Sequence, residues 1–511
     1  SDVYKRQPIY YPSAKPHMGH AYSSIIADFF SRFKTIDGYK VCFLTGTDEH
    51  GLKIQRSAEK EGLDPLKFCD QISKTFRDLS KTLNLTNTDF IRTTEDRHKK
   101  TVQHLWKELE KNDDIYLSNY SGWYSVSDEA FYNEDEIEEI DGKKISISSK
   151  STVEWIEEES YFFRLSKWEK PLLDFYEKNP NFISPESRKN EVISFVKSGL
   201  KDLSVSRKTF SWGIQVPGNE NHVIYVWLDA LTNYISALNY PNKEDKLFKK
   251  FWPASLHLIG KDILRFHAVY WPAFLLAAKI ELPKKVYGHG WILSGDEKMS
   301  KSKGNILDPL QIIDEYGLDP LRYYLIKEVS FGNDGNISQD RLEDCINSDL
   351  ANNYGNLCQR VTSFAIKNCD GKIPEKIKFE EDDLNILNKF KDNLENIRSK
   401  IDQQNLNFYI DYIVNSLFEA NKYFNDQEPW KKKDDITRLN TIVFTSLEII
   451  RKISFLLYPI IPGSVLKALK IFNLGENDIK LEDISKNEFL IKGNSINKID
   501  ILFKKIEKDN D

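Results

Sequence analysis

The sequence predicts an α/β protein whose parallel-sheet domain is split by an inserted module and followed by an all-α helical bundle. Three observations lead to this fold class. Residues 8–117 alternate short apolar runs with amphipathic helical patterns, which is typical of parallel βαβ units. Residues 118–215 instead combine aromatic and acidic side chains with short alternating segments, including Asp141-Gly142 as a hairpin turn. After about residue 340, strand patterns nearly vanish and helical spacing dominates.

The first elements can be placed from their local signals. Pro16 stands where a helix can begin, and the apolar residues that follow recur at helical spacing. Residues 41–44 have the pattern of a buried strand, and the polar turn 45–50 follows them. Ser1–Gln7 lacks an initiator methionine and resembles a truncation scar, so it is excluded from the prediction.

The later elements define the remaining boundaries. Strand patterns return at residues 222–227, 255–260 and 285–290, so 216–294 is predicted to be the second half of the parallel-sheet domain. Residues 295–345 are predicted to form a loop and a contact region. Residues 346–511 are predicted to be the helical bundle, in which Ile413 and Leu417 exemplify the helical spacing.

Bulk properties limit the class of protein. At 511 residues the chain exceeds what one core usually supports. A net charge of -6 argues against a generic nucleic-acid coat but leaves room for a selective RNA enzyme. The five cysteines include no C-x-x-C pair, which fits a reducing cytoplasm. No apolar run approaches the roughly 20 residues of a membrane helix, so a cytoplasmic protein is expected.

A histidine pair marks the start of the first predicted helix. His17 and His20 are three residues apart and share one face of its first turn. Gly19 removes a side chain between them, so a ligand can approach the backbone. A helix N-terminus favours anions, and two imidazoles can donate hydrogen bonds to a phosphate there. Taken alone, the motif also fits a structural histidine pair.

A second motif is a lysine-rich segment bracketed by glycines. Residues 295–305 include Lys298 and Lys301 between Gly295 and Gly304. Glycines allow hinge motion, and ammonium groups can follow charge that builds on a leaving pyrophosphate. Taken alone, this motif also fits a solvated basic loop.

Together and in this order, flanking an insertion, the two motifs resemble the HIGH and KMSKS motifs of class I aminoacyl-tRNA synthetases. The resemblance implies a Rossmann-like catalytic domain, an inserted connective domain and an α-helical anticodon-binding domain. In that family the two histidines and the second lysine stabilise the transition state for transfer of an amino acid onto the α-phosphate of ATP. Carried over, they are His17, His20 and Lys301, and Lys298 is the first lysine of the same motif.

Residues 8 to about 430 resemble the methionyl-tRNA synthetase family throughout. The supporting segments are PIYYP (8–12), TGTDEHG (45–51), YVWLDA (225–230), IGKDI (259–263) and EPW (428–430). The resemblance implies a methionine pocket lined by Ile9, Tyr11, Asp48, Trp227, Ala230, Tyr234, Ile263 and His267, with Trp271 nearby. It implies ATP contacts from His17, Gly19, His20, Gly260, Asp262, His289, Gly290, Trp291, Ile292 and Lys301.

The chemistry of these residues suits methionine. Aromatic walls make favourable contacts with a polarizable thioether, about 0.3–1.5 kcal/mol each. Asp48 ends a predicted strand and can hold the α-ammonium, while Tyr11 and His267 offer polar tips near the sulfur. Plain core packing is the alternative for Trp227, Tyr234 and Trp271. The insertion of roughly 100 residues is too small for the large editing domain that enzymes for branched aliphatic residues use.

The insertion departs from many methionyl enzymes, which carry C-x-x-C zinc knuckles there. Ser125 and Asp128 stand where such cysteines would fall, and they make a poor tetrahedral soft-ligand site. We therefore expect no bound metal and no structural zinc. The core of the insertion is predicted to be aromatic, from Trp123, Tyr124, Phe131, Trp155, Tyr161 and Phe162.

A candidate RNA surface lies in the predicted bundle. Asn356 and Arg360 are spaced i, i+4, and Trp430 precedes a run of three lysines. RNA loops are recognised by stacking bases on aromatic rings and hydrogen-bonding their edges. In methionyl enzymes the matching Asn, Arg and Trp recognise the CAU anticodon. The alternative is a polar helix pair and a buried Trp.

The resemblance implies a two-step reaction with ATP, Mg²⁺, L-methionine and tRNA(Met), serving initiation and elongation of protein synthesis. The chain ends about where the bundle does, so a monomer without a further C-terminal domain is expected. Two other classes remain open at this point: a nucleotidyltransferase that shares the histidine motif, and a non-catalytic tRNA-binding relative. Amino-acid-dependent ATP–pyrophosphate exchange separates all three.

Overall fold

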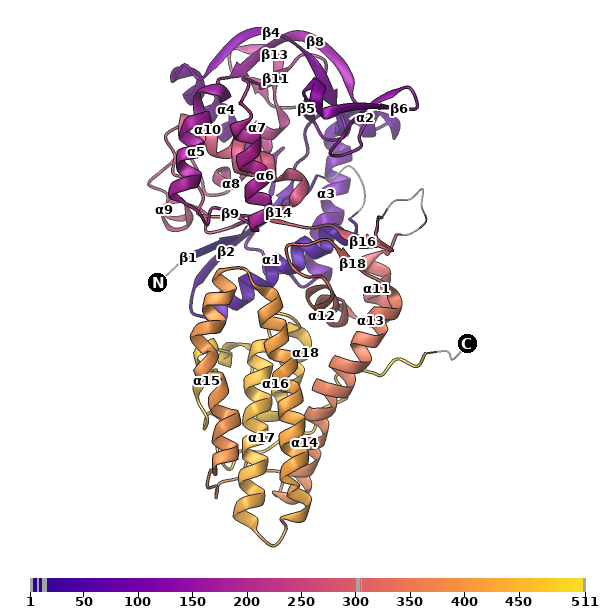
Figure 1. The fold of residues 1–511 in the computed structure, drawn as a ribbon, viewed down its shortest axis with the longest axis vertical. Helices are drawn as coiled ribbons and strands as arrows, with labels where there is room; N and C mark the ends of the chain where they lie inside the picture. The colour runs from indigo at the N-terminus through magenta and orange to yellow at the C-terminus, as the bar shows by residue number, and fades with distance from the viewer. Residues whose placement is uncertain (1–2, 7–8, 12–15, 300–303, 305, 509–511) are drawn as a thin grey trace. The chain divides into compact units, whose positions relative to one another are not determined.

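The computed structural model describes residues 3–6, 9–11, 16–299, 304 and 306–508. The chain divides into two compact units (Figure 1). The sheet unit comprises residues 3–27 and 41–289. The bundle unit comprises residues 28–40 and the described part of 290–511. Helix α1 (Met18–Ile36) contributes its first half to the sheet unit and its second half to the bundle unit.

Parallel strands form the centre of the sheet unit, as predicted. Strand β2 (Lys40–Thr47) pairs in parallel with β3 (Asp89–Arg92), and β14 (His257–Gly260) pairs in parallel with β15 (Val286–His289). The sheets are ordered β1-β2-β3 and β14-β15-β9. Strands β2, β14 and β15 are largely buried, and helices supply most connections between the parallel strands.

The exclusion of Ser1–Gln7 was wrong, because residues 3–6 form strand β1 (Val3–Arg6) at the edge of the first sheet. The prediction judged this segment by its missing methionine. Its backbone nevertheless meets the edge of β2, whose peptide groups need hydrogen-bond partners. Further along, Tyr10 continues the pairing through a parallel bridge to Thr47.

The helices of the sheet unit surround these strands. They are α2 (Leu52–Lys60), α3 (Pro65–Thr82), α4 (Asp96–Lys111), α5 (Glu169–Lys178), α6 (Glu186–Lys197), α7 (Val226–Leu231), α8 (Asn233–Ser236), α9 (Lys246–Phe251) and α10 (Trp271–Ala277). One large apolar core packs against most of them, with Trp106, Phe274 and Trp271 among its fully buried members. Helices α2 and α3 form a separate small cluster, against which Tyr11 packs. Ile9, Trp227 and Ile263 of the predicted pocket pack against the large core.

The inserted segment is dominated by a long antiparallel ribbon (Figure 1). Its strands are β4 (Ile115–Ser125), β5 (Ala130–Tyr132), β6 (Ile137–Ile140), β7 (Lys143–Ser146), β8 (Glu154–Phe163), β10 (Leu203–Ser204), β11 (Ser206–Arg207) and β12 (Gln215–Val216). The predicted turn Asp141-Gly142 is confirmed: it joins β6 to β7 with positive φ at both residues. Strand β9 (Ile183–Ser184), also within residues 118–215, pairs in parallel with β15.

Two details of the prediction were wrong in this region. The strand expected at residues 222–227 ends at Ile224 as β13 (Asn219–Ile224). Residues 226–231 form helix α7 instead, because a short apolar run fits a buried helix as well as a buried strand. The predicted aromatic core is also incomplete. Trp155 is 48% exposed and Trp123 only half-buried, because both lie on the outer face of the ribbon and contact each other there.

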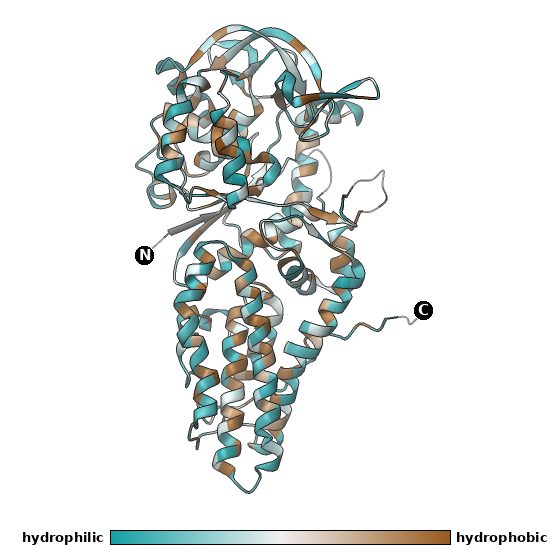
Figure 2. Ribbon diagram, viewed as in Figure 1, coloured by the Kyte–Doolittle hydropathy of each residue, from teal (hydrophilic) through white to brown (hydrophobic). Residues whose placement is uncertain are grey.

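The bundle unit begins with a small sheet and continues into long helices. Its strands are β16 (Ile292–Ser294), β17 (Glu297–Lys298) and β18 (Gly335–Asn336). Its helices are α11 (Pro309–Tyr316), α12 (Leu318–Glu328), α13 (Gln339–Cys345), α14 (Asn356–Asn368), α15 (Glu381–Asp402), α16 (Leu406–Gln427), α17 (Ile436–Leu457) and α18 (Pro462–Leu469). The predicted helical pattern is confirmed, since Ile413 and Leu417 are buried where α14–α17 pack together (Figure 2).

Across the described residues, no helix combines the length and the apolar character that crossing a bilayer requires.

Candidate active site

The predicted phosphate-binding histidines lie at the start of α1. The backbone N–H of His17 donates to Nδ1 of His20, and the N–H of Gly19 donates to Nδ1 of His17, both over 3.1 Å. The two rings are stacked with their centroids 3.8 Å apart. Because both Nδ1 atoms accept hydrogen bonds, each neutral imidazole carries its proton on Nε2. The helix start therefore has two ring N–H donors where an anion is already favoured.

Aromatic neighbours hold His20 in its neutral form. Its ring packs edge-on against Tyr10 and Phe76, each with centroids 5.1 Å away. Burial, reinforced by the charge of His17, holds the pKa of His20 well below its usual range. A Cβ on Gly19 would lie 2.9 Å from the His17 ring, so a side chain at this position would displace that ring from the stacked pair.

Two parallel strands end side by side at the predicted nucleotide site. The register pairs Gly260 of β14 with His289 of β15. The Nε2 atom of His289 lies 2.7 Å from Oγ of Ser23, which stands one helical turn after His20. A Cβ on Gly260 would lie 2.6 Å from the Asp262 carboxylate. The structure thus gathers these residues at the carboxyl ends of parallel strands, where α/β sheets bind nucleotides.

His267 anchors the predicted amino-acid pocket. It lies in the π-helical segment Phe266–Tyr270, a backbone form that is frequent at functional sites. Its Nδ1 is 3.0 Å from the carbonyl oxygen of Ile263, and its Nε2 is 2.6 Å from the Tyr234 hydroxyl. Since a carbonyl can only accept, Nδ1 carries the proton and Tyr234 donates to Nε2. Burial lowers the pKa of His267 to about 4, so the ring is neutral at pH 7.

Stacked aromatic rings form the wall of the predicted pocket beside His267. Trp227 stacks on Phe266 with centroids 3.9 Å apart and planes 6° from parallel, and it lies 6.1 Å from the His267 ring. Trp271 is fully buried and its Nε1 donates to His257, so it belongs to the core behind Tyr234. Ala230 is buried, whereas Ile9 and Ile263 are half-buried against the same core. The sequence did not identify Phe266.

Asp48 has the geometry expected of a cation receptor. It follows β2 directly, and its N–H donates to the Tyr10 carbonyl over 2.7 Å. The residue is 7% exposed, and among the described residues nothing hydrogen-bonds to its Oδ1. Burial, together with the charges of Asp229, Glu129 and Glu49, raises the pKa of Asp48 well above its usual range. A substrate ammonium group would supply the missing charge and donors.

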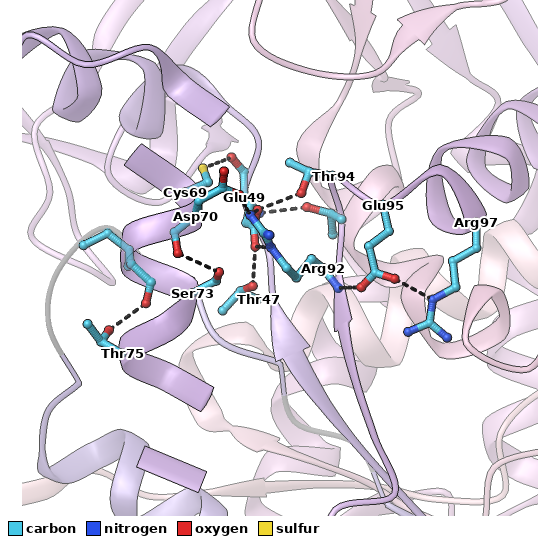
Figure 3. A network of polar contacts seen from close by, with 12 residues as sticks. Thr47, Glu49, Cys69, Asp70, Ser73, Thr75, Arg92, Thr94, Glu95 and Arg97 are labelled. Atoms are coloured by element: carbon cyan, nitrogen blue, oxygen red, sulfur yellow. Dashed lines mark hydrogen bonds and ion pairs between the residues drawn. The ribbon is translucent and has the colours of Figure 1, made fainter. Parts of the chain in front are cut away.

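The neighbouring Glu49 is fully paired and holds this turn in place (Figure 3). Arg92 donates to its two carboxylate oxygens over 2.8 and 2.9 Å. Thr47 and Thr94 donate their hydroxyls to the same carboxylate. Because Glu49 is satisfied from three directions, it fixes the backbone beside Asp48 and leaves Asp48 as the carboxylate with an unmatched oxygen.

A buried His–Asp–His group fixes the helix that carries the pocket residues. Asp229 of α7 accepts hydrogen bonds from His50 and His98, both over 2.6 Å. Although burial acts to raise it, these two histidines bring the pKa of Asp229 below its usual value. Helix α7 also carries Trp227 and Ala230, so the group ties the pocket wall to the turn that follows β2.

The lysine motif lies in the bundle unit and is partly described. Lys301 falls outside the described residues. Gly295 and Asp296, both at positive φ, form the turn of a β16–β17 hairpin, so Glu297 and Lys298 belong to a short strand within the segment predicted to be a loop. The strand geometry places the Lys298 ammonium 4.6 Å from the centre of the Trp291 ring.

The backbone before this hairpin is tightly packed. A Cβ on Gly290 would lie 2.3 Å from the carbonyl of Asn333, and the Trp291 N–H donates to Asp334 over 2.7 Å. Ile292 is buried at the start of β16. Gly290 is therefore required by packing within the bundle unit, whatever further role it has in ATP binding.

The predicted anticodon residues lie at one end of the helical bundle. A cleft of about 480 Å³ is lined by Arg360, Ser363, Phe364, Lys367, Asn368, Phe424, Trp430 and Lys433. The rings of Phe424 and Trp430 meet edge to face at 5.9 Å, and the Arg360 guanidinium lies 5.3 Å from the Phe424 ring. Trp430 is 41% exposed, which argues against a purely buried role. Asn356 is exposed one turn before Arg360 and does not line the cleft.

Hydrogen bonds between side chains, here called the hydroxyl knot, hold the turn at Ser125 and Asp128, where related enzymes carry a zinc knuckle. The Asp128 carboxylate accepts from Tyr132, Ser149 and Ser151 over 2.5–2.6 Å. Ser125 accepts the Asp128 N–H over 3.0 Å. Within the described residues, no three His, Cys, Asp or Glu side chains gather as metal ligands. Hydroxyl groups thus hold this turn with bonds that need no ion.

Comparisons with known proteins agree with these features. The family model described as class I tRNA synthetases (M) matches residues 4–362, and an anticodon-binding domain of methionyl tRNA ligase matches residues 373–511. The methionine–tRNA ligase of Rickettsia felis is 49% identical, with 99% of each chain covered. That of Brucella suis is 49% identical over 93% of this chain and 92% of its own.

Solved structures agree as well. Methionyl-tRNA synthetase of Mycobacterium tuberculosis in complex with methionyl-adenylate superposes with a TM-score of 0.96, at 43% identity, covering 98% of this chain and all of that chain. Its free form gives a TM-score of 0.89 at 40% identity, with 99% of each chain covered. The parallel sheet, the histidine motif and the helical bundle are those of a class I aminoacyl-tRNA synthetase. On this similarity over nearly its whole length, the chain belongs to the methionyl-tRNA synthetase family.

Sequence reasoning missed several residues of the site. Phe266 precedes the predicted residue His267, and Ser23 lies one helical turn after His20. A helical projection of the sequence could therefore have identified both. Phe424 lies within the predicted bundle, but the sequence did not indicate that it lines the cleft. Asp229 and Glu129 had no usable signal, because their importance depends on contacts with segments at least 100 residues away.

Proposed function

We propose that this chain is a methionine–tRNA ligase that activates L-methionine with ATP and transfers it to tRNA(Met). The single observation that carries the proposal is the buried, unmatched carboxylate oxygen of Asp48 beside a neutral aromatic pocket. An α-ammonium group satisfies the carboxylate. An uncharged thioether satisfies a pocket made of Trp227, Tyr234 and neutral His267.

In the first step a methionine carboxylate oxygen attacks the α-phosphorus of ATP. The bond from this phosphorus to the bridging oxygen breaks, and pyrophosphate leaves with the electron pair. The Nε2–H groups of His17 and His20 donate to phosphate oxygens as charge builds on them. Gly260, Asp262 and His289 position the nucleotide at the strand ends. Lys298 and Lys301 neutralise the leaving pyrophosphate.

In the second step the terminal adenosine hydroxyl of tRNA attacks the acyl carbon and AMP leaves. Catalysis here is positioning and charge stabilisation, and it requires no covalent enzyme intermediate. Mg²⁺ bound with ATP would neutralise part of the phosphate charge, since magnesium prefers phosphate and carboxylate oxygens as ligands. The tRNA is selected at the Arg360–Trp430 cleft, where one base stacks on the exposed Trp430 ring. The product supplies initiation and elongation of protein synthesis, and the enzyme acts as a monomer.

ATP–pyrophosphate exchange across the twenty amino acids tests the proposal. Exchange that depends on methionine, followed by methionine transfer to tRNA(Met), is the expected result. Exchange that does not depend on any amino acid would favour a nucleotidyltransferase. The absence of any amino-acid-dependent exchange, with tRNA binding retained, would identify a non-catalytic tRNA-binding protein.

A further inference from the structure

Glu129 is a buried acid whose backbone and burial both set it apart. It lies between β4 and β5 in the inserted segment and is only 3% exposed. Its φ of 49° places it in the left-handed region, where a residue with a side chain is uncommon and pays a conformational cost. Burial raises the pKa of Glu129 to about 8. A strained backbone and a buried carboxyl persist together only where the surroundings enforce them.

The Glu129 carboxylate contacts the amino-acid pocket. Its Oε1 accepts the Tyr11 hydroxyl over 2.7 Å and faces the N–H of Lys53 over 3.4 Å at the start of α2. Gly51 leaves the necessary space: a Cβ there would lie 2.0 Å from Oε1, and its φ of 117° also demands glycine. Glu129 therefore contacts a residue 118 positions earlier in the chain. That residue, Tyr11, is one that the family resemblance assigns to the methionine pocket.

The backbone of the same turn is fastened from two sides. The Glu129 carbonyl accepts the Tyr225 hydroxyl over 2.8 Å. The preceding Asp128 is held by the hydroxyl knot, whose three donors fix its carboxylate. The turn is therefore rigid before substrate arrives, and this rigidity lets Glu129 define where Tyr11 lies.

We propose that Glu129 is a positioning residue for methionine activation: it accepts the Tyr11 hydroxyl and so fixes the Tyr11 ring at the wall of the methionine pocket. This inference rests on the function proposed above. It gives the inserted segment a direct part in substrate binding. The bond, rather than a charge on Glu129, is the essential feature, because Asp48 already supplies the carboxylate for the ammonium group.

The test is methionine-dependent ATP–pyrophosphate exchange with purified full-length variants. Glu129→Ala is expected to raise KM for methionine about tenfold, the size of one lost buried hydrogen bond, while KM for ATP changes less than about twofold. Glu129→Gln keeps an oxygen that accepts the hydroxyl and should stay within about threefold of wild type. Tyr11→Phe removes the bond from the other side and should match Glu129→Ala.

The double variant Tyr11→Phe/Glu129→Ala decides between positioning and independent contributions. If Glu129 acts through the Tyr11 hydroxyl, the double variant is no more than about twofold worse than the worse single variant. Multiplied effects would overturn the proposal, as would an unchanged KM for methionine in Glu129→Ala or Tyr11→Phe. Should Glu129→Ala fail to fold, Tyr11→Phe tests the same bond by loss of one oxygen.

Glu154→Gln is the matched control, since Glu154 lies in the same insertion and is exposed. It should leave all kinetic constants at wild-type values. The outcomes also separate this inference from the proposed function. A wild-type protein without methionine-dependent exchange contradicts the proposed function, whereas normal exchange in wild type and in both single variants contradicts only the role of Glu129.

Discussion

At the scale of single residues, the pocket is defined by which polar atoms are satisfied. Glu49 has three partners and Asp229 has two histidines, whereas Asp48 retains one buried oxygen without a partner among the described residues. An unsatisfied buried carboxylate lowers the stability of the protein without ligand. The same oxygen favours binding of a cationic group. Asp48 therefore strengthens substrate binding while it lowers the stability of the ligand-free protein.

Asp48→Asn should therefore weaken methionine binding and leave the fold intact. Loss of a charge-assisted hydrogen bond predicts a rise in KM for methionine on the order of 100-fold, with KM for ATP nearly unchanged. The thermal midpoint should stay close to that of wild type, because Asn keeps the size and shape of the Asp48 side chain. Exchange kinetics and calorimetry measure both. Asp135→Asn, at an exposed position, should change neither quantity.

His267 predicts a pH dependence of stability. Its pKa is about 4 in the folded state and higher when unfolded, so the unfolded chain binds more protons between these values. Stability thus falls as pH drops below about 6.5. Between pH 7 and pH 5 this histidine alone should account for about 2 kcal/mol. Urea unfolding of wild type and His267→Gln at both pH values isolates the contribution, and equal pH dependence in the two proteins would contradict it.

At the scale of elements, short segments are held by side-chain hydrogen bonds and by packing of exposed rings. The turn between β4 and β5 is closed by serine and tyrosine hydroxyls on Asp128. The proposed anticodon cleft is formed where Arg360 of α14 and Phe424 of α16 lie beside the 3₁₀ turn Pro429–Lys431. In both places, polar and aromatic contacts give a surface segment a fixed conformation.

Because the hydroxyl knot needs no metal ion, we expect that a zinc chelator does not change the exchange activity. Purified protein should contain less than about 0.1 zinc per chain, because serine hydroxyls are poor zinc ligands. Treatment with a zinc chelator, followed by restored Mg²⁺, should leave exchange activity unchanged. Elemental analysis that finds stoichiometric zinc would refute this. Asp128→Ala should instead lower stability, since three hydroxyl donors lose their acceptor.

The cleft predicts a separation of the two reactions. Trp430→Ala should reduce the rate of tRNA charging by two or more orders of magnitude, because stacking of one base contributes about 1–3 kcal/mol and orients the anticodon. Methionine-dependent exchange should be unchanged, since it needs no tRNA. Equal loss of both activities would show that Trp430 is structural. Phe418→Ala, at an exposed ring elsewhere on α16, is the control and should affect neither.

At the scale of the whole molecule, α1 is a continuous helix that belongs to both compact units. Its first turn carries His17 and His20, and its second half is integrated into the bundle unit. There Arg322 donates to Asp28 over 2.6 Å and to the carbonyls of Pro459 and Ile460. Both charged side chains are fully buried. This cluster joins three segments that are far apart in the sequence.

Arg322→Met should therefore destabilise the protein strongly. It removes one buried ionic partner of Asp28, which also pairs with Arg32, and removes the donors to two carbonyls, so the free energy of unfolding should fall by about 3 kcal/mol. Urea unfolding measures the change. Arg341→Met breaks an ion pair in which Arg341 is 64% exposed, so it should change the free energy of unfolding far less than Arg322→Met. Similar losses in both variants would contradict the importance of burial.

The sequence by itself determined the elements and the chemistry that depend on local pattern. Helical spacing predicted the bundle, the Asp141-Gly142 dipeptide predicted a hairpin, and the histidine motif predicted a phosphate site at a helix start. Each follows from periodicity or from the conformational preferences of a few neighbouring residues. Sequence signals failed where local pattern was ambiguous: residues 226–231 have strand-like composition but form a helix, and Val3–Arg6 is a strand because it completes a sheet edge.

The tertiary structure alone decided which residues meet. Whether a carboxylate is satisfied depends on partners distant in the chain, so sequence could not distinguish Asp48 from Glu49 or Asp229. Likewise, Glu129 has no local signal, and its contact with Tyr11 exists because the insertion folds back onto the strand end. Burial and hydrogen-bond geometry are properties of the assembled fold, and only they show which of the predicted residues lie together in the proposed methionine pocket.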